Sequence, residues 1–334
     1  MCSCHYFCIY ICIQCGSRNL SGFPREARYL ILILYNTSIS GVQCNTNTSS
    51  TSFARIGVII VGAGTNGTLP SSIGNFQRIN IMHLWGGIRG TLPSTIGALK
   101  QLYSLRFDKC RFNGTIPSII GALTKLSFLK LSPNSFTGTI PSTISALKSL
   151  TDLFLYANHL TGTIPSFIST LTSLRYLDLG LNSFTGIIPS SFLALKSLND
   201  LYLHENSLIG TIPSVITAST SLRTLVLGKN SLTGTIPSGI SELRYLSKFD
   251  LSFNSLNGTI PSTMSVFISL RTVFFQNNYL TMGTATTVPT STFSSYTLSS
   301  TMNLSSNCLA FHTDSPYRHV TATHCRPTSK YRFK

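Results

Sequence analysis

Acidic residues are scarce in this 334-residue chain. It has nine Asp and Glu against 25 Lys and Arg, and charged residues make up only 10% of the sequence. Among so few carboxylates, no pair stands out that could share general acid–base work, and no Ser–His–Asp arrangement stands out either. The sequence therefore predicts a protein that is not an enzyme.

The sequence also lacks a long apolar run. No stretch reaches the roughly 18 residues that a membrane-spanning helix needs. Residues 7–13 are apolar enough for the core of a signal peptide, but no basic segment precedes them and five cysteines crowd the first 15 residues. We therefore assign residues 1–20 to a divergent leader or a non-native start. Cys12 and Cys15 form a single CxxC without a partner pair, so we predict no metal site.

What the chain does contain is a regular repeat. A tetrapeptide of the form Gly-Thr-Ile-Pro recurs, with a first interval of 23 residues and seven intervals of 24. Its prolines are Pro70, Pro93, Pro117, Pro141, Pro165, Pro189, Pro213, Pro237 and Pro261. A fixed period of this length is typical of a solenoid, in which each coil packs on the next.

Each repeat has the form L-x-x-L-x-L-x-x-N-x-L-x-G-x-I-P-x-x-I-x-x-L. The L-x-L core has the period of a strand, so its leucines face the core and the residues between them face out. The recurring asparagine must find hydrogen-bond partners when buried, and the backbone of neighbouring coils supplies them. These ladder asparagines are Asn134, Asn158, Asn182, Asn206, Asn230, Asn254 and Asn278. Cys110 occupies the same position in an earlier repeat, where we expect a buried free thiol.

These repeats resemble the plant-type leucine-rich repeats of receptor-kinase ectodomains and polygalacturonase-inhibiting proteins. The resemblance covers residues 56–280. It implies an α/β solenoid, a right-handed coil of about 10–11 turns of 23–24 residues, with a parallel sheet on the concave face and capped ends.

The resemblance also suggests a domain plan. We predict a truncated N-terminal cap at residues 21–55, repeats at 56–281, and a C-terminal cap with a basic tail at 282–334. Residues 25–36 resemble the helix of the family's N-terminal cap, and residues 41–44 resemble its end. Cys308 and Cys325 bracket the C-terminal cap, and we predict that they form a disulfide that closes the open end of the solenoid.

Acceptor sequences for N-glycosylation are frequent. They give modest support for a secreted or cell-surface glycoprotein, because they also arise easily in a chain rich in Ser and Thr. The glycosylation candidates are Asn66, Asn113, Asn257 and Asn303.

The net charge of +16 raises the question of nucleic-acid binding. We call the outward residues of the repeat strands, at the third, fifth, seventh and eighth repeat positions, the strip. The strip carries six of the nine acidic residues but only five of the 25 basic ones. A nucleic-acid groove would concentrate Lys and Arg there. We therefore predict no nucleic-acid partner.

One motif suggests a cofactor. Gly62, Gly64 and Gly67 match the G-x-G-x-x-G pattern of dinucleotide sites. However, Pro70 follows in phase with the repeat where a helix should begin, and no acidic residue lies about 20 residues further on. We therefore predict no cofactor.

Aromatic and acidic residues gather on the strip in the fifth to seventh coils. Aromatic side chains on rigid strands are typical of interface hot spots, although outward positions of repeats also vary freely. The predicted ligand-binding residues are Asp152, Phe154, Tyr156, Tyr176, Asp178, Asp200, Tyr202, His204 and Glu205. Such a patch would suit a partner with a cationic and apolar stretch.

These features predict an extracellular recognition module that binds a peptide or protein on its concave face, as a monomer or through ligand-induced pairing. Two alternatives stay open. One is an inhibitor of an extracellular glycan hydrolase, which the resemblance to polygalacturonase-inhibiting proteins suggests. The other is a structural component of a wall or matrix.

Overall fold

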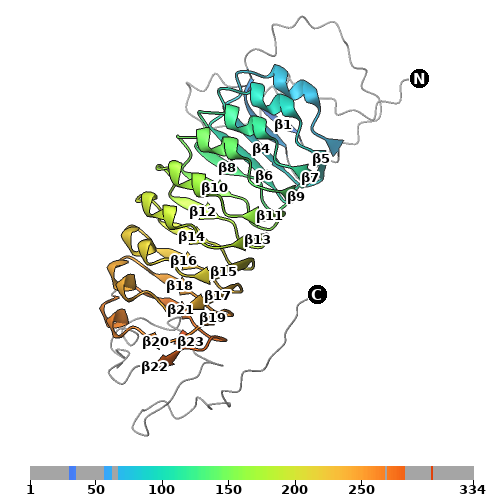
Figure 1. Ribbon diagram of the computed structural model, residues 1–334. Coiled ribbons are helices and arrows are strands. Elements are labelled where there is room, and N and C mark those ends of the chain that lie inside the picture. The colour runs from blue at the N-terminus through green and yellow to red at the C-terminus, as the bar shows by residue number, and fades with distance from the viewer. Residues whose placement is uncertain (1–29, 35–55, 62–66, 268, 283–301, 304–334) are drawn as a thin grey trace, which may run out of the picture. The chain divides into compact units, whose positions relative to one another are not determined.

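The computed structural model describes residues 30–34, 56–61, 67–267, 269–282 and 302–303 (Figure 1). The chain divides into two compact units, residues 1–183 and residues 184–334. In both units each repeat contributes short parallel strands and a 3-10 helix, so the solenoid architecture predicted from the repeat is confirmed. The handedness of the coil and the concave placement of the long sheet stay predictions.

The strip lies on a parallel sheet that runs through every repeat. In the first unit its strands are, in spatial order, β1 (Leu30–Leu34), β2 (Ile56–Val61), β4 (Ile81–Trp85), β6 (Ser104–Asp108), β8 (Phe128–Lys130), β10 (Asp152–Phe154) and β12 (Tyr176–Asp178). In the second unit they are β14 (Asp200–Tyr202), β16 (Thr224–Val226), β18 (Lys248–Asp250), β21 (Thr272–Phe274) and β23 (Met302–Asn303).

The register of this long sheet follows the repeat. Asp152 lies beside Phe128 on one side and Tyr176 on the other, at intervals of 24 residues. In the second unit Thr224 lies between Asp200 and Lys248 in the same way. Equivalent repeat positions therefore form straight rows across the strip of each unit.

A second parallel sheet is formed by short strands, one in each repeat, that come directly after the ladder position. The first unit contains β3 (Gly67–Thr68), β5 (Ile88–Thr91), β7 (Arg111–Thr115), β9 (Ser135–Gly138) and β11 (His159–Thr163). The second contains β13 (Ser183–Gly186), β15 (Ser207–Thr211), β17 (Ser231–Gly234) and β19 (Ser255–Leu256), with a separate pair of β20 (Thr259–Ile260) and β22 (Thr281–Met282). From β5 on, its strands pair residues 22 apart, as Thr115 with Thr137 and Thr211 with Thr233, whereas β3 and β5 pair residues 21 apart.

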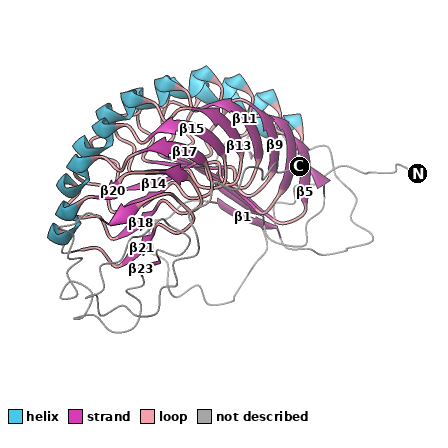
Figure 2. Ribbon diagram, turned by 60° about the horizontal axis from the view of Figure 1, so that its bottom comes forward, coloured by secondary structure: helices cyan, strands magenta, loops and turns pink. Residues whose placement is uncertain are grey.

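The helical elements are 3-10 helices of five residues. They are η2 (Ser71–Asn75), η3 (Ser94–Ala98), η4 (Ser118–Ala122), η5 (Ser142–Ala146), η6 (Ser166–Thr170), η7 (Ser190–Ala194), η8 (Ser214–Ala218), η9 (Ser238–Glu242) and η10 (Ser262–Val266). A repeat proline precedes each one, and its ring fixes the backbone at the point where the chain turns. Figure 2 shows these helices in cyan along the outer edge of each unit.

The core consists of the inward repeat positions. In one coil Leu129, Leu131, Phe136 and Ile144 are completely buried, and the equivalent positions are buried in the coils on either side. Burial of each such side chain contributes roughly 1.5–3 kcal/mol. Every coil therefore adds its own share of the hydrophobic stabilisation.

The first described segment corrects one prediction. Residues 30–34, expected within a cap helix, form strand β1, which pairs with β2 and places Leu34 beside Val61. The Leu-Ile-Leu-Ile-Leu sequence suits a strand, and pairing covers an edge of the sheet that would otherwise be open. Cys44, Cys308, Cys325 and Asn66 lie outside the described residues. Among the described residues, no helix is long and apolar enough to cross a membrane.

Candidate ligand-binding surface

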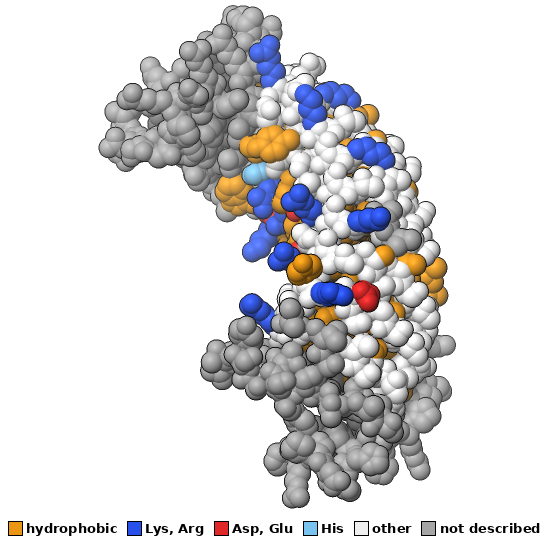
Figure 3. Space-filling view, turned by 90° about the vertical axis from the view of Figure 1, so that its left-hand side faces the viewer, with side chains coloured by type: hydrophobic (Ala, Val, Ile, Leu, Met, Phe, Trp, Pro, Cys, Tyr) orange, Lys and Arg blue, Asp and Glu red, His pale blue; other side chains and the backbone are white. Residues whose placement is uncertain are grey.

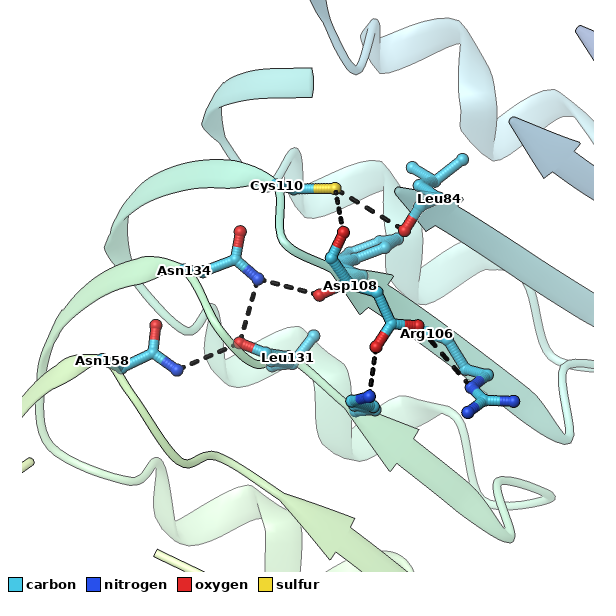
Figure 4. A network of polar contacts seen from close by, with 9 residues as sticks. Leu84, Arg106, Asp108, Cys110, Leu131, Asn134 and Asn158 are labelled. Carbon is cyan, nitrogen blue, oxygen red and sulfur yellow. Dashed lines mark hydrogen bonds and ion pairs between the residues drawn. The ribbon is translucent and has the colours of Figure 1, made fainter. Parts of the chain in front are cut away.

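The ladder asparagines hold the strip strands in place. The Asn158 amide oxygen accepts a hydrogen bond from the Phe136 N–H at 3.0 Å, and its nitrogen donates to the carbonyls of Leu131 and Leu155 at 3.0 Å. Figure 4 shows Asn134 and Asn158 both turned toward the Leu131 carbonyl. The same pattern recurs at Asn182, Asn230, Asn254 and Asn278. Asn206 accepts from the Phe184 N–H at 2.9 Å.

Cys110 takes the place of an asparagine in this ladder. Its thiol lies 3.6 Å from the carbonyl oxygens of Leu84 and Asp108 (Figure 4). It is free and buried, and burial is the main cause that raises its pKa to about 12. The thiol is therefore protonated at neutral pH, and Cys110 serves as a ladder residue rather than a nucleophile.

Three aromatic side chains form a stack on the strip of the first unit. The ring centroids of Phe128 and Phe154 lie 5.3 Å apart, and those of Phe154 and Tyr176 lie 4.4 Å apart. Phe128 and Tyr176 occupy the same repeat position on β8 and β12, on either side of Asp152, and Phe154 lies two residues further along β10, beside Lys130 and Asp178. All three are half-buried. We call these three residues the aromatic ladder.

Two basic side chains lie over the aromatic ladder. The Arg106 guanidinium carbon is 4.7 Å from the centroid of the Phe128 ring, and the Lys130 Nζ is 5.9 Å from that of Phe154. Asp108 forms an ion pair with Lys130 and lies 3.8 Å from the Arg106 Nε (Figure 4). The cation–π contacts expected from a ligand are therefore already made by the protein's own side chains.

The predicted acidic residues of the first unit differ in their surroundings. Asp178 is only 8% exposed, and its carboxylate accepts a hydrogen bond from the Gly180 N–H at 3.0 Å. Burial is the main cause that raises its pKa to about 6. Asp152 is half-buried and accepts from the Thr151 hydroxyl at 2.6 Å. Asp178 thus closes the turn after β12, and of the two only Asp152 is placed to contact a ligand.

The second unit carries the remaining predicted residues. Asp200, Tyr202 and His204 are half-buried, and the Lys248 Nζ lies 5.8 Å from the centroid of the Tyr202 ring. Burial is the main cause that lowers the pKa of His204. Glu205 has a positive φ of 52° and forms an ion pair of 2.8 Å with Lys229. Tyr202 and Glu205 therefore each already have a lysine side chain of the strip as a neighbour.

The predicted set of ligand-binding residues overlaps the aromatic ladder and its cations only in part. It included Phe154, Tyr156 and Tyr176 but left out Phe128, Arg106 and Lys130. The signal was present, because Phe128 and Tyr176 occupy the same repeat position, two repeats of 24 residues apart. Figure 3 shows basic side chains beside hydrophobic ones on one face of the molecule, with neutral polar groups over most of the described remainder.

Comparison with models of known families identifies the same repeat type as the sequence pattern. A leucine-rich-repeat family model matches residues 155–208, and a second one matches residues 221–243 and 245–267. No curated protein matches the sequence. The fold, the ladder and these matches identify a leucine-rich-repeat protein.

Similar solved structures indicate which type of leucine-rich-repeat protein this is. A TDR receptor is 28% identical with a TM-score of 0.72, over 78% of this chain and 45% of that chain. The plant peptide hormone receptor RGFR1 in complex with RGF2 is 32% identical with a TM-score of 0.68, over 78% and 42%. A plant ice-binding protein is 26% identical with a TM-score of 0.63, over 75% and 80%. The chain spans less than half the length of the two receptors. It is a leucine-rich-repeat protein of the plant type.

Proposed function

We propose that this protein is an extracellular module that binds a peptide or protein through the strip. The aromatic ladder is the observation that carries the proposal. Its rings lie on adjacent strands, with the centroids of Phe128 and Phe154 5.3 Å apart and those of Phe154 and Tyr176 4.4 Å apart. Rings held in this way lose little conformational entropy when a ligand covers them. Similar structures include RGFR1 in complex with RGF2 and the receptor kinase HAESA in complex with the peptide hormone IDA.

The chemistry of the ladder suggests what such a ligand would present. Arg106 and Lys130 lie over the Phe128 and Phe154 rings, so apolar ring surface and positive charge are adjacent. A ligand with an apolar side chain next to a carboxylate would fit this arrangement, since the carboxylate can compete with Asp108 for the two cations. This ligand differs from the cationic partner that the sequence suggested.

The test is a double variant, Phe154→Ala with Tyr176→Ala. Peptides selected by the unmodified chain from a displayed random library should lose at least roughly 30-fold in affinity, or about 2 kcal/mol, because two ring contacts disappear. The control is Tyr245→Ala, which removes an aromatic side chain that is 61% exposed and lies after η9, away from the strip. Selected peptides that bind the double variant and the control equally well would contradict the proposal.

We also propose that the protein is secreted or displayed at the cell surface, as the similar receptor ectodomains suggest. Asn113 and Asn257 are exposed and accessible for N-glycosylation. Protein secreted from a eukaryotic host should lose mass at both sites on treatment with an N-glycosidase. Unmodified asparagine at both sites in the secreted protein would contradict the glycosylation proposal.

A further inference from the structure

The outward side of the second sheet has an unusual composition in the second unit. The residues that flank the repeat glycines of β13, β15 and β17 are all exposed and all β-branched. They are Thr185, Ile187, Ile209, Thr211, Thr233 and Thr235. We call these six residues the threonine face. The other outward residues of β13, β15, β17 and β19 are serines, and these strands carry no charge.

A neutral face of this kind is unlike an ordinary protein surface, where about 25–35% of residues are charged. It offers no charge pattern that could orient a protein or nucleic-acid partner. The only aromatic side chain on its described strands, Phe184 of β13, is buried in the core, so the face offers no ring on which a sugar polymer could stack. The chemistry that it does offer is hydroxyl groups alternating with methyl groups.

Two threonines of this face, Thr211 and Thr235, are held in one orientation. A Cβ on Gly234 would lie 2.8 Å from the Thr211 γ2-methyl, and a Cβ on Gly258 would lie 2.8 Å from that of Thr235. Both glycines have a φ of +75°. Each methyl therefore rests on the glycine of the next coil, which fixes the direction of the hydroxyl. A Cβ on Gly210 would likewise lie 2.9 Å from the Ile187 γ2-methyl, so this methyl takes the same place in its coil.

The Thr233 hydroxyl donates a hydrogen bond of 3.3 Å to the Gly210 carbonyl, whereas those of Thr211 and Thr235 are open to solvent. Within the part of the chain that the structure describes, the Thr211 and Thr235 side chains make no hydrogen bond to another protein group. Their donor and acceptor positions are thus available to water. The first unit repeats the arrangement, with the methyls of Thr115 and Thr139 resting on Gly138 and Gly162.

The register of the second sheet turns these residues into a two-dimensional array. In the second unit its strands pair residues 22 apart, so Thr211 lies beside Thr233 rather than beside its own repeat equivalent, Thr235. Neighbouring strands are about 4.8 Å apart. A spacing of this size is close to a repeat distance between oxygen atoms on the faces of hexagonal ice.

We propose that the threonine face binds ice. Its fixed hydroxyls bond to surface water, and its methyls order the water between them, so the bound layer can join the crystal lattice. Each contact is weak, but a rigid array makes many of them at once, and simultaneous contacts raise the total affinity steeply. A neutral surface suits this partner, since charged side chains would hold water in arrangements that do not match the lattice.

The experiment measures capture of the full chain, produced without N-glycans, into slowly growing ice, together with inhibition of ice recrystallisation. The unmodified chain should be concentrated in the ice fraction. The double variant Thr211→Tyr with Thr235→Tyr should lose at least roughly tenfold in both assays, because bulky rings break the array. The control, Thr220→Tyr with Thr263→Tyr, changes two exposed threonines outside the face and should behave like the unmodified chain.

The outcomes separate this proposal from the alternatives. Exclusion of the unmodified chain from ice, or equal behaviour of the two double variants, would overturn it. Binding to crystalline cellulose or chitin that depends on Thr211 and Thr235, without ice capture, would assign the face to a polysaccharide instead. The Phe154→Ala, Tyr176→Ala variant should retain ice capture, so the proposal is independent of peptide binding by the strip. Equal melting temperatures of all variants would show that the fold is intact.

Discussion

At the scale of single residues, the ladder asparagines connect sequence to structure most directly. Asn158 is 6% exposed and satisfies backbone groups of two successive coils. Replacing it by Leu leaves the Phe136 N–H and the Leu131 carbonyl without this buried partner, so Asn158→Leu should lower the free energy of unfolding by about 3 kcal/mol. Urea denaturation measures the change.

Asn113 provides the matched control for this prediction. It is exposed on β7, outside the ladder, and Asn113→Ala should change the free energy of unfolding by less than about 0.5 kcal/mol. Comparable losses in the two variants would mean that the ladder does not stabilise the coils in the way that its hydrogen bonds indicate.

Asp178 makes the stability of the protein depend on pH. Its pKa is raised from 3.8 to about 6, chiefly by burial, so the folded state binds its proton more tightly than the unfolded state. The resulting stabilisation is complete below pH 4 and is lost as the pH rises through about 6. Asp178→Asn keeps an acceptor for the Gly180 N–H and carries no charge.

The Asp178→Asn variant should therefore gain about 2–3 kcal/mol over the unmodified protein between pH 4 and pH 7. Urea denaturation at the two pH values measures this difference. His83, whose pKa burial lowers to about 4, acts in the opposite direction but is present in both proteins and cancels. A difference that does not change with pH would show that Asp178 is accessible to water in solution.

At the scale of elements, the 3-10 helices pack through specific glycines. A Cβ on Gly121, in η4, would collide with the Thr143 carbonyl oxygen in η5. Because backbone has to move, Gly121→Ala should cost about 2 kcal/mol or more. Ser145 occupies the same position one repeat later and already carries a Cβ, so Ser145→Ala should stay within about 0.5 kcal/mol. Thermal unfolding of both variants tests this, and equal melting temperatures would contradict it.

The two sheets show how far the repeat period predicts register. Across β8, β10 and β12 of the long sheet the paired residues are 24 apart, as the period suggests, so Phe128, Asp152 and Tyr176 form one row and Phe154 lies two residues further along β10. From β5 on in the second sheet the paired residues are 22 apart. The period specifies which residues recur, but the offset between neighbouring strands depends on how the chain turns at the repeat glycines. The threonine array could therefore not be derived from the sequence.

At the scale of the whole molecule, the ends of the solenoid need protection, because a terminal coil exposes its row of leucines. The predicted bridge between Cys308 and Cys325 lies outside the described residues and stays a prediction. Cys325→Ser should lower the free energy of unfolding by about 3 kcal/mol. Peptide mapping without reductant should find the two cysteines linked and Cys110 free. A free thiol at Cys308 would contradict the bridge.

The sequence by itself determined the solenoid, the rows of buried leucines and the positions of the ladder asparagines. It could do so because each coil contacts mainly its neighbours, so a short repeated pattern contains most of the packing information. Only the tertiary structure decided that Asp178 is buried, that Arg106 and Lys130 lie over aromatic rings, and that residues 30–34 form a strand. These features arise from contacts between side chains of different coils and from the pairing of a further strand with the edge of the sheet. The period of the repeat predicts neither of them.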